Sequence, residues 1–173
     1  MKISKIFLLL LVAAIAFSAC ETLPKQEVTY SPTFPVSGEY LVRVNYASKL
    51  NGADSVAASA SIFAMRTYNT SSNTKDTVWV KLGASSAAYK FGLLGKSSCN
   101  PTAATFSVAG GNNLVYSKSF TILEGKVLLG KAKVPSKSVC DSIYVRFTTA
   151  NDPTKIYVVK GHRRTGFLED ENI

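Results

Sequence analysis

The chain has 173 residues, of which 46% are hydrophobic and 18% are charged, and its 20 basic side chains outnumber 11 acidic ones. This length predicts one folded domain and leaves no room for a second. The scattered lysines lack interleaved aromatic residues and any Gly-Lys-Ser/Thr motif, which argues against nucleic acid and nucleotides as partners.

The chain opens with MKISKIFLLLLVAAIAFSAC, which has the organisation of an export signal. Lys2 and Lys5 precede an unbroken apolar stretch over residues 6–17, shorter than the roughly 20 residues that a spanning helix needs. The last four letters, FSAC, resemble a bacterial lipobox, in which the cysteine is acylated and becomes the mature N-terminus. We therefore predict a signal peptide over residues 1–19 and a lipid anchor on Cys20, with an ordinary signal peptide as the alternative.

Removal of the signal peptide would leave 18 basic and 11 acidic side chains, an excess that suits a surface near anionic membrane or glycan. Glu21 follows the acylated position, where Asp would favour retention at the inner membrane, so we expect the outer membrane. Periplasmic and surface-exposed placements both remain open, as does the oligomeric state.

Residues 20–36 form the next segment, which contains three of the chain's six prolines and no repeating apolar face. Because proline fixes φ and removes backbone donors, we predict an extended tether here. The folded domain is then expected over residues 37–173.

Alternation of β-branched or aromatic residues with polar ones begins at Gly38 and continues almost to the end of the chain. Eight or nine short strands are expected, in the segments EYLVRVNY, IFAMRTYN, DTVWVKLG, AAYKFGLL, TAATFSV, NLVYSKSFTIL, KVLLGKAKV, SVCDSIYVRFTT and KIYVVKGH. Such a chain forms either a sandwich or a closed barrel. Tight turns at Glu124-Gly125 and over residues 110–113 favour a meander, so we predict an all-β, antiparallel up-and-down barrel.

Cys99 and Cys140 are the cysteines that remain after acylation, and an oxidising compartment would allow a disulfide between them. The expected strands place the two at opposite ends of the barrel, which argues against a bridge. No histidine lies near either cysteine in the sequence, so we expect no catalytic thiol, no metal site and no cofactor.

Several motifs mark the domain over residues 37–171: SGEYLV at the first strand, DTVWV in the middle, DSIYVRF near the end, and the closing GHRRTGFLED. Together with the acylated cysteine, they resemble a family of Gram-negative bacterial lipoproteins labelled lipid-binding, lipocalin-like or "lipid-binding putative hydrolase". The resemblance implies a lipocalin-like, calycin-type barrel that binds a small apolar ligand. The lipocalin signature has Gly-x-Trp on the first strand, whereas Gly38-Glu39-Tyr40 carries tyrosine in place of tryptophan.

The closing stretch is expected to latch the last strand to the first. A late basic residue packs across the first strand in the resembling family, so Arg163 or Arg164 would lie over Tyr40, a contact that contributes roughly 0.5–2 kcal/mol. Glycines would let the chain turn, and Phe167 would plug the end of the barrel. The latch residues are Gly38, Tyr40, Gly161, His162, Arg163, Arg164, Gly166 and Phe167. A solvated basic turn is the alternative.

The word hydrolase in the family label has little support in the residues. His162 is the only histidine, so any Ser-His-acid triad must use it, and no Gly-x-Ser-x-Gly elbow presents a serine. Asp141, Asp152 and Glu169 could supply an acid, but they have no identifiable serine partner. We therefore name no catalytic residue.

An eight-stranded barrel holds either packed side chains or one small ligand. The inward faces supply the candidate ligand-binding residues Val42, Val44, Tyr46, Val78, Val80, Leu82, Tyr116, Lys118, Phe120, Ile122, Ile143, Val145 and Phe147. Lys118 would meet a fatty-acid carboxylate in the lumen or lie at the mouth with its ammonium in water. A filled core without a cavity is the alternative.

Three functions follow in order of expectation. The first is a membrane-anchored carrier or sensor of a small apolar molecule such as a fatty acid. The second is a structural or adhesive lipoprotein that binds protein or glycan through its loops, notably residues 71–75 and 110–113. The third is a hydrolase, which requires His162 within hydrogen-bond reach of a serine or carboxylate.

Overall fold

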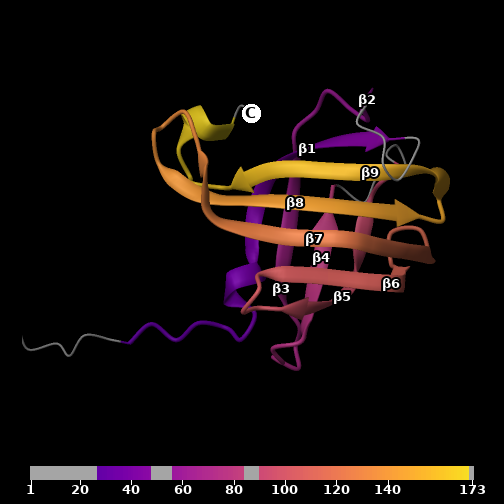
Figure 1. Cartoon of the computed structure of the whole chain (residues 1–173), viewed down its shortest axis with the longest axis horizontal. Helices are drawn as coiled ribbons and strands as arrows, with labels where there is room; N and C mark the ends of the chain where they lie inside the picture. Colours follow the sequence, from indigo (N-terminus) through magenta and orange to yellow (C-terminus); the bar gives the residue numbers. More distant parts are fainter. Residues whose placement is uncertain (1–26, 48–55, 84–89, 172–173) are drawn as a thin grey trace, which may run out of the picture.

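The computed structural model describes residues 27–47, 56–83 and 90–171 (Figure 1). Nine strands lie there between two 3-10 helices (η), in the order η1 Phe34–Val36, β1 Gly38–Ala47, β2 Val56–Ala57, β3 Phe63–Asn69, β4 Thr77–Leu82, β5 Leu93–Asn100, β6 Thr105–Asn113, β7 Lys118–Lys133, β8 Val139–Thr149, β9 Asp152–Arg163 and η2 Leu168–Glu171. Within these residues, no helix is long and apolar enough to cross a membrane.

The strands form one antiparallel sheet that closes on itself. Each strand from β3 to β8 pairs with the next, and β1 pairs with both β3 and β9, which makes a barrel of eight strands. The short strand β2 adds to β1 beside Asn45 and Tyr46. The predicted all-β up-and-down barrel is confirmed, and its closure removes the unpaired edges that an open sheet would expose.

The connectivity gives the barrel two different ends, which we call the base and the mouth. β1 begins at the base, and because neighbouring strands are antiparallel, the β7–β8 hairpin and the end of β9 lie there too. Figure 1 shows the tip of this hairpin and η2 together at one end of the barrel. The β6–β7 and β8–β9 turns lie at the mouth.

The segment just before β1 closes the base. Thr33 and Val36 are completely buried, and Val36 belongs to the hydrophobic core. The hydroxyl of Thr67 on β3 donates a hydrogen bond to the carbonyl of Val36, which fixes η1 against the barrel wall. The last residues of the expected tether are therefore part of the domain, because Val36 supplies apolar surface that the core needs.

The two cysteines lie at the same end of the barrel, contrary to the prediction. Cys99 is near the end of β5 and Cys140 near the start of β8, and antiparallel order brings both positions to the base. The prediction failed because the expected turn at Glu124-Gly125 is absent. Both residues lie inside the single strand β7, so the chain reverses once less between the two cysteines than expected. Both are free thiols, and burial raises the pKa of each, which lowers their reactivity.

Candidate functional site

The middle of the barrel is a filled core. Ten of the thirteen candidate ligand-binding residues are at most 2% exposed, namely Val42, Val44, Val78, Val80, Leu82, Phe120, Ile122, Ile143, Val145 and Phe147. A cavity large enough for one water molecule would give the side chains on its walls solvent-accessible area, and these ten have almost none. These ten residues point into the barrel, as predicted. Their side chains pack against one another around the barrel axis and do not line a cavity.

The other three candidates lie toward the mouth. Tyr46, near the end of β1, and Tyr116, in the β6–β7 turn, are half-buried. Lys118 begins β7 and its side chain is exposed, so of its two expected positions it takes the one in water. A ligand at the lumen centre would have no contact with this ammonium.

A pocket of about 200 Å³ opens at the mouth. The β8–β9 hairpin contributes three of the lining residues, because Asp152, Lys155 and Tyr157 lie within the first half of β9. Among the residues that the structure describes, the lining is Tyr46, Ala58, Lys90, Phe91, Asp152, Lys155 and Tyr157. Two lysines and two tyrosines therefore surround a pocket whose floor is apolar.

Aromatic rings form the floor of this pocket. The ring of Tyr157 stacks on that of Phe147 with centroids 5.3 Å apart, and Phe91 lies 5.6 Å from Tyr157. Phe63 meets Phe91 edge-on at 5.2 Å. Such aromatic contacts each add about 0.5–1.5 kcal/mol beyond burial. The four rings belong to the hydrophobic core, so the floor of the pocket is the end of the core nearest the mouth.

The charges at the mouth are arranged around Asp152. Its carboxylate accepts hydrogen bonds from the hydroxyls of Tyr157 and Thr154, both at 2.9 Å, and lies 3.3 Å from Nζ of Lys155. Burial alone would raise the pKa of Asp152, but these partners outweigh it and hold the pKa below its usual value. Nζ of Lys155 also lies 4.4 Å from the ring centroid of Tyr46, so this ammonium is fixed over the pocket.

Sequence reasoning named Tyr46 as a lumen residue and Asp152 only as a possible acid, and it missed the rest of the pocket lining. Alternation in KIYVVKGH places Tyr157 on the same face as Val159, a signal that could have added Tyr157 to the inward set. The approach of Lys155 to Tyr46 depends on the pairing of β9 with β1, between residues 109 positions apart, for which the local sequence carries no signal.

Raising the pH above about 10 is expected to destabilise the barrel through Tyr157. Burial and its hydrogen bond to Asp152 raise the pKa of this tyrosine above its ordinary value near 10. Its contribution to stability is therefore complete below about pH 10 and is lost as the pH rises further, because the unfolded chain ionises first. Thermal unfolding from about pH 8 to 11 should show a fall in Tm that is smaller in Tyr157→Phe. Equal falls in both proteins would assign the effect to other groups.

The closing stretch joins the last strand to the first through Arg163. The guanidinium lies 5.5 Å from the ring centroid of Tyr40 and donates a hydrogen bond of 3.1 Å to the carbonyl of Ser37. Its Nε lies 2.8 Å from a carboxylate oxygen of Asp141. A Cβ at Gly38 would sit 3.1 Å from both the guanidinium and the tyrosine ring, so the glycine leaves room for this stack.

Arg164 makes a second, more exposed contact with β1. Its backbone N–H donates to the carbonyl of Glu39 at 2.9 Å, and its guanidinium pairs with the carboxylates of Glu39 and Glu171. Hydrogen bonds from Arg66 and Arg164 hold the pKa of Glu39 below its usual value. This part of the latch is a surface network, whose individual pairs contribute little stability.

Phe167 does not plug the barrel. Its side chain is 52% exposed, and Val36 of η1 fills the base instead. Gly166 just before it has φ of +88°, a conformation that favours glycine and turns the chain away from the barrel into η2.

His162 is buried, and the hydrogen bond described for its ring is to the backbone. Its Nε2 lies 3.2 Å from the carbonyl oxygen of Asp170, and this aspartate accepts hydrogen bonds from Ser136 and Thr165. Among the hydrogen bonds of residues 27–47, 56–83 and 90–171, none joins His162 to a serine hydroxyl. The same residues contain no group of three His, Cys, Asp or Glu side chains that could hold a metal ion.

Fold and site together define a small antiparallel β-barrel that is closed at its base by a helical turn and has a pocket at the mouth. The chain belongs to the family described as lipid-binding putative hydrolase, whose model matches residues 25–168. The predicted family is thus confirmed, and the chain is a member of a lipid-binding family. None of the curated proteins matches the chain.

A solved structure of a Bacteroides ovatus protein of unknown function is similar at 14% identity, with a TM-score of 0.47. The similarity covers 79% of this chain and 44% of that one, so this chain spans less than half the length of the Bacteroides protein.

Proposed function

We propose that this protein is an exported lipoprotein, anchored through acylated Cys20, which binds the polar head of a lipid or fatty acid at the mouth of its barrel. The observation that carries the proposal is the pocket in which Lys90 and Lys155, the latter paired with Asp152, lie around an aromatic floor and leave an excess of one positive charge. Cations above an apolar surface match a ligand that is anionic at one end and apolar behind it.

The size of the pocket limits how much of the ligand it holds. About 200 Å³ is below the range of roughly 300–1,000 Å³ that is usual for small-molecule sites. The head group and its first methylenes fit there, packed on Phe91 and Ala58. A longer tail enters only if the rings of Phe91 and Tyr157 move apart, so this floor would set the ligand length.

The test is palmitate binding by residues 21–173, measured by native mass spectrometry and by titration. The core cluster is drawn from residues 36–159, so this part of the chain is expected to fold without the signal peptide. Replacing both Lys90 and Lys155 by Gln should weaken binding at least about tenfold, since a charge-assisted hydrogen bond contributes about 1.5–3 kcal/mol. Lys81→Gln, on the outer wall of β4, should bind as the parent does.

Two results would contradict the proposal. One is palmitate binding with equal affinity in the double variant and the parent. The other is a bare mass that stays unchanged after incubation with palmitate, which would assign the mouth no role in lipid binding.

A further inference from the structure

The β7–β8 hairpin and the C-terminal segment form one element at the base of the barrel. The backbone N–H and the hydroxyl of Ser136, in the hairpin turn, donate to the carboxylate of Asp170 at 2.8 and 2.7 Å. These bonds hold η2 against the turn, and Val134 is buried in the hairpin. We call residues 128–139 together with residues 167–171 the basal tip.

Large apolar side chains are unusually exposed on the basal tip. Five of them are between 40% and 84% exposed, namely Leu128 at 40%, Leu129 at 54%, Val139 at 66%, Phe167 at 52% and Leu168 at 84%. A single exposed leucine is ordinary on any soluble protein. Five on one small element at the end of the barrel indicate a surface that meets an apolar partner.

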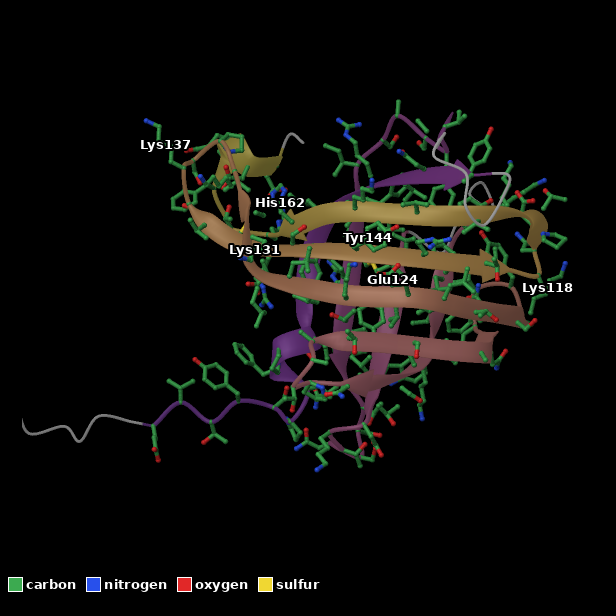
Figure 2. All side chains as sticks on the ribbon, in the orientation of Figure 1. Lys118, Glu124, Lys131, Lys137, Tyr144 and His162 are labelled. Atoms are coloured by element: carbon green, nitrogen blue, oxygen red, sulfur yellow. The ribbon has the colours of Figure 1, made fainter. Side chains whose placement is uncertain are left out.

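The basal tip carries three lysines and three acids, but the exposed charges among them are mainly positive. Lys131, Lys133 and Lys137 are all exposed, and in the part of the chain that the structure describes no ion pair neutralises them. Figure 2 shows Lys131 and Lys137 at this end of the molecule and Lys118 at the opposite end. Of the three acids, Asp170 is buried and bonded to Ser136 and Thr165, Glu171 is paired with Arg164, and Glu169 is exposed. The partner that suits this tip is therefore both apolar and anionic.

The chain enters the barrel at the same end. Residues 27–33 lead into η1 and β1 at the base, and Tyr30 stacks on Phe34 there with centroids 4.0 Å apart. An anchor on Cys20 would thus hold the base, and not the mouth, toward the bilayer. This orientation rests on the proposed lipid anchor, whereas the exposed side chains of the basal tip do not depend on it.

We propose that the basal tip docks on an anionic lipid bilayer. Its leucines, Val139 and Phe167 enter the interface between head groups and acyl chains, and its lysines contact lipid phosphates. The mouth then faces away from the surface to which the protein is bound.

Vesicle co-sedimentation of residues 21–173, which lack the acylated cysteine, tests the docking directly. The chain should bind vesicles of phosphatidylcholine with phosphatidylglycerol and bind pure phosphatidylcholine vesicles at least about fivefold more weakly, because each basic side chain near an anionic surface contributes attraction. Replacing Lys131, Lys133 and Lys137 by Gln should remove most of that preference, as should about 0.5 M salt.

A matched pair of variants separates the apolar contribution of the basal tip from non-specific binding to vesicles. Leu129→Asp combined with Leu168→Asp should lower vesicle binding at least about tenfold, because both side chains are exposed and leave the core intact. Leu114→Asp, which is 51% exposed near the mouth, should bind vesicles like the parent. Thermal unfolding and palmitate titration of every variant keep a loss of docking distinct from unfolding and from a failure at the mouth.

Equal vesicle binding by the Leu129/Leu168 and Leu114 variants would overturn the proposal. So would an absence of binding to either kind of vesicle in the parent chain. Concentration-dependent dimerisation that disappears in the Leu129/Leu168 variant, without vesicle binding, would assign the basal tip to contact with a second copy and would also overturn it.

Discussion

Replacing Gly161 by alanine is expected to be among the most destabilising single changes in this barrel. A Cβ at this position would lie 1.9 Å from the carbonyl oxygen of Leu41 and 2.7 Å from Cα of Val42. Both are backbone atoms of β1, so relief requires the closing strands to separate. We expect a loss of at least about 3 kcal/mol in the free energy of unfolding, at the upper end of overpacking costs. Urea denaturation followed by circular dichroism measures it.

Gly110→Ala is the control, because no atom lies within 4 Å of its Cβ position and its φ of +66° adds only conformational strain. That strain is worth about 1–2 kcal/mol. A Gly161→Ala protein no less stable than the Gly110→Ala protein would show that β1 and β9 do not approach as closely as the structure has them.

Removing the Arg163 side chain is expected to be the next most damaging change. Arg163→Ala loses the stack on Tyr40 and the hydrogen bond to Ser37. It also removes the ion-pair partner of the partly buried carboxylate of Asp141, which keeps only the hydrogen bond from the Gly130 N–H. The expected cost is about 2–4 kcal/mol, from the cation–π contact and a charge-assisted hydrogen bond together. The midpoint of urea unfolding should fall accordingly.

Two further variants show whether the stack itself matters. Arg163→Lys keeps the charge but loses the planar guanidinium, so its stability should lie between those of the parent and Arg163→Ala. Arg164→Ala removes the more exposed neighbour and should cost much less, because its ion pairs are in water. A loss in Arg164→Ala equal to that in Arg163→Ala would contradict the assignment of the latch to Arg163.

Much of the barrel could be predicted from the sequence, because period-two alternation is a local signal. The positions that alternate in β1, such as Val42 and Val44, are indeed inside. Alternation does not show whether inward side chains meet across the axis, so the choice between a cavity and a filled core needed the structure. Val36 was missed for a related reason, since a single apolar residue between a proline and a serine has no periodicity to reveal it.

The pocket at the mouth was largely beyond sequence reasoning. Its lining comes from strands and turns that are far apart in the chain, and the short KFG and TKIY stretches contain no motif that marks a site. Arg163 was named because the resemblance placed a basic residue near the first strand. The choice between Arg163 and Arg164 was left open, since alternation in a turn after a strand is unreliable.

The pairing of β1 with β9 also bears on how fast the chain folds and when it can do so. Tyr40 and Arg163 are 123 residues apart, and the contacts between their strands complete the barrel. Proteins dominated by such distant pairings fold on a timescale of about milliseconds to seconds, slower than chains with local contacts. A partly synthesised chain lacks its final strand, so its barrel would stay open until its last residues emerge.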